Sequence, residues 1–259
     1  YLDVLNPAAV EAFIKSTYVV YREAFGGKFP ADVPAIFTDE PQLAKPVKGL
    51  MKNAEIHRAS WTDDLPETFE MAFGEGLLEL LPYLFWPTAE GPHPVRWQFW
   101  KHIAERFTDA FSNQIGAWCG ESGIALTGHL MQEDTLEAQT YGVGECMMHY
   151  PAYQIPGIDV LCDRYHPVTA KQTVSANRQV GRHAVLSELY GVTNWDFPFA
   201  GHKRQGDWQA ALGITLRVHH LTWLSMDGAS KRDYPASIGI QSPWYREYPL
   251  IENHFARVN

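Results

Sequence analysis

The chain has 259 residues, of which 46% are hydrophobic and 20% are charged, with a formal net charge of −9 at pH 7. This composition excludes a disordered chain. The acidic balance, without a basic stripe, argues against a nucleic-acid partner, because phosphates are bound by clustered Lys and Arg. The longest apolar run, residues 76–86, contains Glu79 and Pro82 and is too short to cross a bilayer, so no membrane partner is expected.

The length suits one α/β barrel domain, so residues 1–259 are predicted to form a single, partial catalytic domain. The chain starts with YLDVLNP, without Met or an apolar signal core, which favours a piece of a longer protein with other domains. Three widely spaced cysteines, Cys119, Cys146 and Cys162, match neither a zinc site nor a disulfide framework. They are predicted to be packing residues.

In chain order, the first predicted element is a helix over residues 7–25, because Asn6 can cap it and two glycines follow it. Residues 34–41 form a short apolar run between prolines and are predicted to be a buried strand. Helical patterns follow over residues 66–86 and 94–120, and a second strand is predicted over residues 124–131. The order strand, helix, strand is typical of a parallel sheet.

The same order recurs in the second half of the chain. A strand is predicted at 153–161, a helix at 169–181 and a strand at 184–191, and residues 207–223 give a helix followed by a strand. The sheet is therefore either doubly wound or closed into a barrel. Because no GxGxxG or GxxxxGK[ST] motif is present, the nucleotide-binding folds are disfavoured. The predicted fold is a (β/α)8 TIM-like barrel of which only the later strands and helices are present.

Acids and histidines fall at the ends of these predicted strands. They are Asp39, Glu40, His129, Glu133, Asp159, Glu188, His219 and His220. The carboxyl ends of all strands in a barrel open on one face, where the chemistry takes place, so these side chains are expected to share a pocket. Of the two adjacent histidines, at most one can face the barrel interior, because side chains alternate along a strand.

Glutamates at three strand ends fit glycoside hydrolysis. One carboxyl group must protonate the departing glycosidic oxygen while another attacks the anomeric carbon or activates water, and Glu40, Glu133 and Glu188 are the candidates. Surplus carboxylates are also oxygen ligands for a hard cation such as calcium. His129 is a candidate for binding a substrate hydroxyl. No HExxH or GxSxG motif supports a zinc protease or a serine nucleophile.

The order of the motifs resembles the catalytic domain of glycoside hydrolase family 106, the α-L-rhamnosidases. The motifs are FTDEP, WC, TGHLMQE, PGIDVL, KQTVSANRQVG, LSELYG, DW, HH and SPWY, and they run over nearly the whole chain. The resemblance implies a TIM-like barrel in a larger bacterial enzyme, secreted or periplasmic, that removes L-rhamnose from plant polysaccharides or glycoconjugates by inversion. It also implies a calcium ion near the sugar.

The resemblance carries site roles onto particular positions. If the last strand is the eighth, Glu40 lies on the fourth and Glu188 on the seventh, where the catalytic acids sit in many barrel glycosidases. Glu40 is then the expected acid and Glu188 the base, an assignment that can be reversed. Glu133 is the third candidate and the preferred calcium ligand, and it replaces Glu188 if the strand count is off.

Substrate-binding positions complete the expectation, and alternatives stay open. The expected positions are Asp39, His129, Asp159, Trp195, His219 and Trp244, the two tryptophans as platforms for a sugar face. One alternative is a retaining barrel glycosidase resembling a β-galactosidase, and another is a non-catalytic carbohydrate-binding barrel. The carboxyl separation distinguishes retention, at about 5–5.5 Å, from inversion, at about 6.5–9.5 Å.

Overall fold

The chain folds around one parallel sheet, seen in a computed structural model that describes residues 2–43, 59–232, 234 and 236–258. The strands are β1 (Ala35–Asp39), β2 (Ala125–His129), β3 (Ile155–Asp159), β4 (Leu186–Leu189) and β5 (Leu216–His219). They pair in the order β1-β2-β3-β4-β5, every pair parallel. The α/β class and the five strand segments are confirmed. The described residues form half of a barrel.

Helices connect and flank the strands. The α-helices are α1 (Pro7–Ser16), α2 (Tyr18–Ala24), α3 (Leu65–Phe73), α4 (Leu77–Phe85), α5 (Val95–Phe107), α6 (Gln114–Glu121), α7 (Leu136–Gly142), α8 (Cys146–His149), α9 (Pro167–Gln179), α10 (Phe199–Leu212) and α11 (Pro249–Val258). A π-helical turn, η1 (Thr108–Asn113), joins α5 to α6, and 3-10 turns occupy η2 (Tyr150–Ala152), η3 (Ala229–Arg232) and η4 (Tyr245–Glu247).

Three of the predicted helices are interrupted. The first breaks at Thr17, whose φ of −121° and ψ of −73° are not helical. The second breaks at Gly74, which takes a left-handed conformation (φ 75°) and ends α3. The third holds the π-helical turn η1. Helical periodicity continues across such breaks, so the apolar pattern alone cannot locate them. The helix α10 also starts earlier than predicted.

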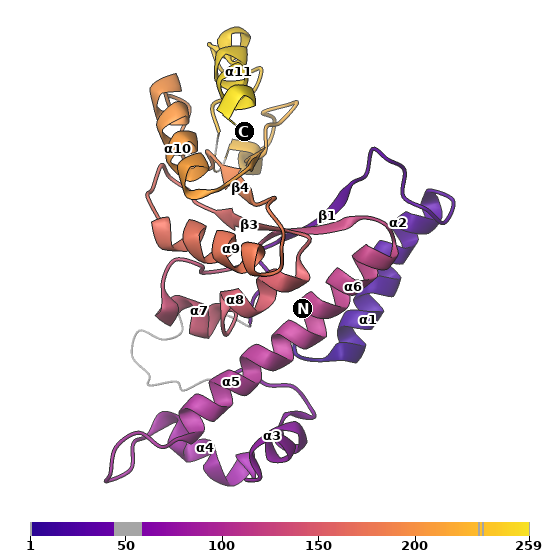
Figure 1. Ribbon diagram of the computed structural model, residues 1–259, viewed down its shortest axis with the longest axis vertical. Helices are drawn as coiled ribbons and strands as arrows, with labels where there is room; N and C mark the ends of the chain where they lie inside the picture. Colours follow the sequence, from indigo (N-terminus) through magenta and orange to yellow (C-terminus); the bar gives the residue numbers. More distant parts are fainter. Residues whose placement is uncertain (1, 44–58, 233, 235, 259) are drawn as a thin grey trace.

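The helices cover one face of the sheet. Helix α6 packs against β2 and α9 packs against β3. Figure 1 shows α5, η1 and α6 as one long rod beside α1 and α2, with α3 and α4 at one end of the molecule and α10 and α11 at the other. The largest apolar core lies among α1, α3, α5, η1 and α6, under β1 and β2.

The opposite face of the sheet, which would line a barrel, is open. In register on this inner face, Phe37 of β1 and both Leu216 and Val218 of β5 keep 38%, 41% and 37% of their surface exposed. Such residues are normally buried inside a barrel, where inward side chains pack in layers. The exposure follows from the half-barrel: no strand among the described residues faces them.

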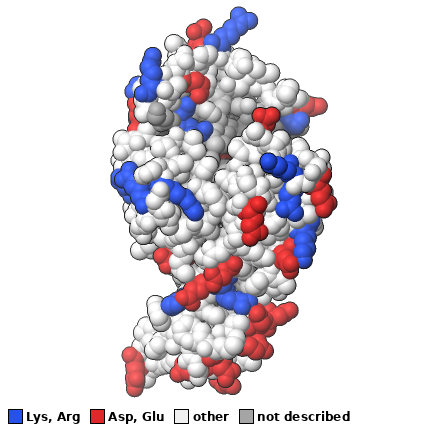
Figure 2. All heavy atoms as spheres, turned by 45° about the vertical axis from the view of Figure 1, so that its right-hand side comes forward, with Lys and Arg blue, Asp and Glu red and all other residues white. Residues whose placement is uncertain are grey.

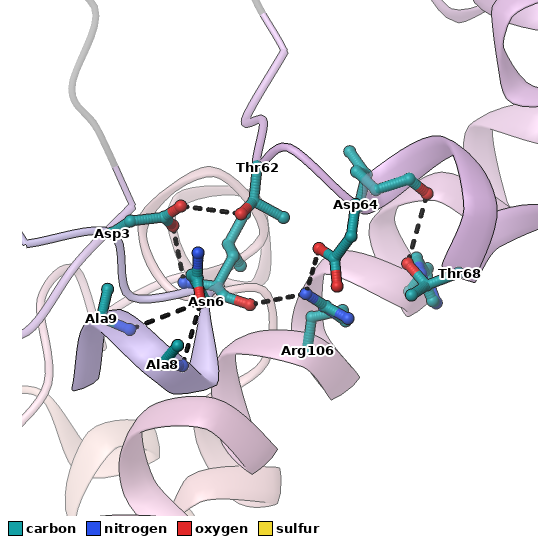
Figure 3. Close-up of polar contacts among 11 residues, drawn as sticks. Asp3, Asn6, Ala8, Ala9, Thr62, Asp64, Thr68 and Arg106 are labelled. Carbon is teal, nitrogen blue, oxygen red and sulfur yellow. Dashed lines mark hydrogen bonds and ion pairs between the residues drawn. The ribbon is translucent and has the colours of Figure 1, made fainter. Parts of the chain in front are cut away.

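Polar contacts fix the start of the chain to the helical layer (Figure 3). Thr62 donates a hydrogen bond to Asp3 (Oγ1–Oδ2 2.7 Å), and Asn6 caps α1 by accepting from Ala8 N at 2.9 Å. Arg106 of α5 donates both to the carbonyl oxygen of Leu5 (3.0 Å) and to Asp64 (2.6 Å). The N-terminal segment, the start of α3 and α5 therefore hold together next to β1.

Charge on the surface is uneven. On the face in Figure 2, acidic side chains gather at the end of the molecule that holds α3 and α4, and acidic and basic side chains alternate elsewhere. Among the helices of the described chain, none is long and apolar enough to cross a membrane.

Candidate active site

The register of the sheet brings the predicted acids together on the inner face. Asp39 at the end of β1 lies beside His129 at the end of β2, and Asp159 of β3 lies beside Glu188 of β4. Residues in register on parallel strands point to the same side of a sheet. These four side chains thus form one cluster at the carboxyl edge of the half-barrel, as expected for a barrel active site.

His129 is the centre of this cluster. Its side chain is 1% exposed, and its Nε2 lies 2.8 Å from Glu188 Oε2 and 3.6 Å from Asp39 Oδ1. The imidazole N–H donates to Glu188, which fixes the rotamer of that carboxylate. The other ring nitrogen, Nδ1, is buried without a hydrogen-bond partner in the part of the chain that the structure describes.

The glycine of the TGH motif is needed for this placement. Gly128 has φ 121°, and a β-carbon there would lie 2.0 Å from the carbonyl oxygen of Thr38 on the neighbouring strand. Any larger residue would both strain the backbone and push β1 away from β2. The close approach of the two strands is what brings Asp39 within reach of His129.

Glu40 joins the cluster through an unusual backbone conformation. Strand alternation alone would point it away from Asp39, but Glu40 has φ 47°, so the chain turns at the end of β1. Side-chain ligand atoms of Glu40, His129 and Asp159 lie within 4.8 Å of one another. Both carboxylates of the FTDEP motif therefore lie near His129: Asp39 groups with Glu188, and Glu40 groups with Asp159.

The loops after the strands are strained. Among the described residues, those other than glycine with positive φ are Glu40, Gln132, Cys162, Asp163, Tyr190, Val192, Asn194 and Tyr234. Seven of them lie in the segments directly after β1, β2, β3 and β4, and Tyr234 follows η3. Left-handed conformations of such residues cost about 1–3 kcal/mol each and concentrate at functional sites. This distribution independently marks the carboxyl edge as the functional one.

Burial and crowding change the proton affinities in the cluster. Burial alone would lower the pKa of His129, but the hydrogen bond to Glu188 and the carboxylates of Glu133 and Asp159 outweigh it and raise the pKa to about 9. Burial raises the pKa of Asp159 to about 7, and Glu188, Glu40 and Asp39 add to the rise while His129 opposes it. At neutral pH the cluster thus holds a cationic imidazole and a carboxyl group that can carry a proton.

Glu133 has a different surrounding from the other acids. Its side chain is 5% exposed, and its carboxylate accepts hydrogen bonds from Leu130 N (3.2 Å), Tyr150 Oη (3.3 Å) and Asp159 N (3.1 Å). Burial raises the pKa of Glu133 to about 7, opposed by His129 and by the two backbone donors. The geometry makes Glu133 a brace between the ends of β2 and β3.

Glu133, the expected calcium ligand, accepts hydrogen bonds from Leu130, Tyr150 and Asp159. The groups of described side chains that are close enough to share an ion are Asp39, His129 and Glu188, and Glu40, His129 and Asp159. Both include an imidazole that is already hydrogen-bonded to Glu188. Calcium prefers six to eight oxygen ligands.

Two of the expected substrate-binding residues, His219 and Trp244, contact residues outside the cluster. His219 is on the outer face of β5, where its Nε2 lies 3.2 Å from Tyr248 Oη and 3.2 Å from Glu252 Oε1 of α11. Trp244 donates to the carbonyl oxygen of Ser237 and packs against Phe199 of α10. His219 ends up there because it is one residue out of phase with Val218, which faces inward.

A third expected residue, Trp195, is in the loop after β4. Its side chain is 40% exposed, and its neighbour Asn194 pairs with Ala236. His220, the other member of the histidine pair, packs its ring against Tyr234. None of these side chains lines the two hollows that contain the acids within the described residues.

Two hollows adjoin the cluster. A cavity of about 150 Å³ is lined by Glu40, Glu133, Asp134, Asp159, Arg164 and His166, among others. A larger hollow of about 1000 Å³ runs along β1 and is lined by Asp39 and mostly apolar side chains, with Trp61 among them. The sequence analysis missed Trp61 and Arg164. Both lie in irregular segments, where no periodicity assigns a face to a side chain.

Comparisons with known proteins show the fold. No protein-family model matches the chain, and no curated protein matches it in sequence. Among solved structures, a rhamnosidase from Novosphingobium sp. PP1Y is similar, with a TM-score of 0.72 and 16% sequence identity. The match covers 98% of this chain and 24% of the rhamnosidase chain, so the chain spans about a quarter of that protein's length. At this identity the likeness establishes a shared architecture.

Proposed function

We propose that this chain carries the catalytic carboxylates of a glycoside hydrolase that removes terminal α-L-rhamnose from plant polysaccharides or glycoconjugates. The observation that supports it most is the convergence of Glu40, Asp159 and Glu188 on His129, at the carboxyl edge of a half-barrel with the architecture of a rhamnosidase. Paired carboxyl groups at this edge are what glycoside hydrolysis requires. The motif order gives the first choice of sugar.

In the proposed mechanism, Glu40 donates a proton to the glycosidic oxygen as the bond from that oxygen to the anomeric carbon breaks. Glu188 takes a proton from water, and the oxygen of that water forms the new bond to the anomeric carbon. The products are free rhamnose and the alcohol of the remaining chain. His129 orients Glu188, and Asp159, whose pKa is about 7, places a second proton-carrying carboxyl group beside Glu40.

Inversion is proposed because the motif order resembles family 106, which implies it. Glu40 and Glu188 belong to different groups of close side chains, each of which shares His129. Inverting enzymes need the wider separation, since a water molecule must fit between the base and the sugar. The competing arrangement, a retaining enzyme of the β-galactosidase kind, would use Glu188 as a nucleophile.

The test is hydrolysis of 4-nitrophenyl α-L-rhamnopyranoside by the longest natural protein that contains this chain, with the matching β-D-galactopyranoside as control substrate. The expected result is release of nitrophenol from the rhamnoside and little from the galactoside. Proton NMR at early times should show the anomer of rhamnose opposite to that of the substrate. Release with the same anomer would replace inversion by retention.

Two further outcomes bear on the proposal. Tight binding of rhamnosides without any turnover would favour the non-catalytic carbohydrate-binding barrel. Calcium is a separate proposal, with Glu133 as the preferred ligand, and activity unchanged after exhaustive chelation would remove it. A secreted or periplasmic location and a bacterial origin stay predictions, to be checked by fractionating cells that express the natural protein.

A further inference from the structure

Helices α7 and α9 both hold the main chain of Glu133, in the loop after β2. Gln172 of α9 donates from Nε2 to the carbonyl oxygen of Glu133 at 3.0 Å. Two further side chains donate to the same oxygen, Gln139 of α7 at 3.0 Å and Thr169 of α9 at 3.3 Å. A carbonyl oxygen has two lone pairs, so three side-chain donors are more than this atom needs. The fold therefore uses two helices to fix a single peptide group.

The two glutamine amides also belong to a chain of hydrogen bonds that ends on the carboxylate of Glu133. The N–H of Cys146, at the start of α8, donates to Gln139 Oε1 (3.4 Å), and Gln139 Nε2 donates to Gln172 Oε1 (3.0 Å). Gln172 Nε2 donates to Tyr150 Oη (3.4 Å), and this hydroxyl donates to Glu133 Oε1 (3.3 Å). In such a chain each hydrogen bond polarises the next. Gln172 thus supports Glu133 twice, directly at the carbonyl oxygen and through Tyr150 at the carboxylate.

The group that Glu133 holds in turn is the end of β3. Its Oε2 accepts from the N–H of Asp159 at 3.1 Å, and the side-chain ligand atoms of Asp159, Glu40 and His129 lie within 4.8 Å of one another. Gln132, the residue before Glu133, has φ 58°, a left-handed conformation that persists only where surrounding contacts hold it. A release of the Glu133 main chain would therefore shift the amide of Asp159. A misplacement of about 1 Å at reacting groups can cost about a hundred-fold in rate.

We propose that Gln172 is a positioning residue for the glycosidase reaction: it fixes Glu133, and through Glu133 the carboxyl group of Asp159, without touching the substrate. This inference rests on the proposed function. Among the described residues that line the two hollows beside the acids, α9 contributes Thr169 and not Gln172. A side chain that binds substrate directly changes KM, whereas one that only places the reacting groups changes kcat. The loss of Gln172 should therefore appear in kcat.

The test uses two replacements of Gln172 in the longest natural protein that contains this chain. Gln172→Met keeps the length of the side chain and removes its hydrogen bonds, and Gln172→Glu keeps the shape but turns an acceptor oxygen toward the carbonyl oxygen of Glu133. The matched control is Asn177→Leu on the same helix. Asn177 is buried, and its Nδ2 donates to the carbonyl oxygen of Ala184 at 2.9 Å, just before β4 begins and thus at the opposite end of the strands from the acids.

On the nitrophenyl rhamnoside, both Gln172 variants should lower kcat about ten- to hundred-fold and leave KM within about two-fold of the unmodified protein. Asn177→Leu should lower the urea midpoint of unfolding and leave kcat unchanged. An unchanged kcat in both Gln172 variants, a rise in KM alone, or an equal loss of kcat in Asn177→Leu would overturn the inference.

Hydrogen–deuterium exchange of the peptide that contains Asp159 gives a readout that does not depend on turnover. The amide of Asp159 should exchange about two- to ten-fold faster in Gln172→Met and at the original rate in Asn177→Leu, because only the first change loosens its acceptor Glu133. Unchanged exchange in Gln172→Met would also overturn the inference. If the unmodified protein cleaves no rhamnoside, the proposed function fails, while the exchange rates still decide whether Gln172 positions Asp159.

Discussion

Two histidines on opposite faces of the same sheet, His129 buried and His219 half-buried, each contact a glutamate, yet their surroundings change their pKa values in opposite directions. His129 on the inner face lies 2.8 Å from Glu188, and its pKa is raised to about 9. His219 on the outer face lies 3.2 Å from Glu252, and its pKa is lowered to about 4. A histidine beside a glutamate is therefore not by itself a charged pair.

The difference comes from the other charges nearby. Burial lowers the pKa of both rings. Near His219, Arg217 lies 2.9 Å from Glu252 and stacks on Phe255, so Glu252 already has a cationic partner. The lowering of the His219 pKa by burial then exceeds the raising by Glu252. Around His129 no cation is an immediate partner among the described residues, and several carboxylates share the one imidazole.

The comparison separates two uses of buried polar groups. On the outer face, a cation, a neutral imidazole, a tyrosine and a glutamate attach α11 to β5. On the inner face, the carboxylates of Asp39 and Glu188 both lie near the single imidazole of His129. Such an arrangement is costly for stability, and active sites are where it usually persists. The predictions that follow test this division.

The largest effect is expected on turnover. Glu188→Gln removes the proposed base while nearly preserving shape, so kcat on the nitrophenyl rhamnoside should fall by about 10²–10⁴-fold. The matched outer-face change, Glu252→Gln, should leave kcat close to that of the unmodified protein. It should instead lower the free energy of unfolding by about 1–3 kcal/mol, because Arg217 loses its partner. An equal loss of kcat in both variants would contradict the assignment of catalysis to the inner face and stability to the outer face.

The second effect is on stability as a function of pH. The pKa of His129 is about 9 in the folded protein, above its ordinary value of 6.5. Protonated His129 therefore contributes about 3 kcal/mol to the free energy of unfolding below pH 6.5, and this contribution is lost as pH rises through 9. A folded pKa of about 4 for His219 contributes stability that is present above pH 6.5 and lost as pH falls toward 4. His129→Gln and His219→Gln should therefore flatten opposite limbs of the stability profile.

Urea unfolding from pH 4 to 9.5 measures these limbs. Asp159 and Glu133 add to this trend, because their pKa values in the folded protein are raised to about 7. The unfolded chain releases these protons at lower pH, so the free energy of unfolding should also fall as pH rises from about 4 to 7. The inner face is thus expected to favour acid conditions and the outer face to favour neutral ones. If His129→Gln changed the acid limb and left the alkaline limb intact, the assignment of charge to His129 would be wrong.

The sequence predicted the strands well, because each is a short apolar run with a turn signal on both sides. It also predicted that the acids would meet, since parallel strands present their carboxyl ends at one edge. It placed Glu40 in the same pocket, but not by the means the structure shows, because the inward turn of Glu40 depends on a left-handed backbone and not on alternation along β1. Nor could it separate Glu133 from Glu188, since the donors to Glu133 include Tyr150 and Asp159, which are distant in sequence.

His219 shows a further limit. Its direction depends on the register of β5, and its partners lie in a helix that follows some 30 residues later, with Glu252 at a sequence distance of 33 from it. The short run of strand-like residues fixes the existence of β5 but not which histidine faces inward. The alternation rule correctly predicted that at most one of the pair would do so.

The smallest effect is the sharpest comparison, because it applies one chemical change to both faces. Tyr248→Phe removes the hydroxyl 3.2 Å from His219, and Tyr150→Phe removes the hydroxyl that donates to Glu133 at 3.3 Å. Both rings are buried, so each change should lower the free energy of unfolding by about 1 kcal/mol, as measured by urea unfolding.

The two variants should differ in kcat. Without Tyr150, Glu133 loses a donor and holds the backbone of Asp159 less firmly, so kcat should fall, whereas Tyr248→Phe should leave it unchanged. Equal kcat in both variants would mean that Glu133 braces the fold and not the site.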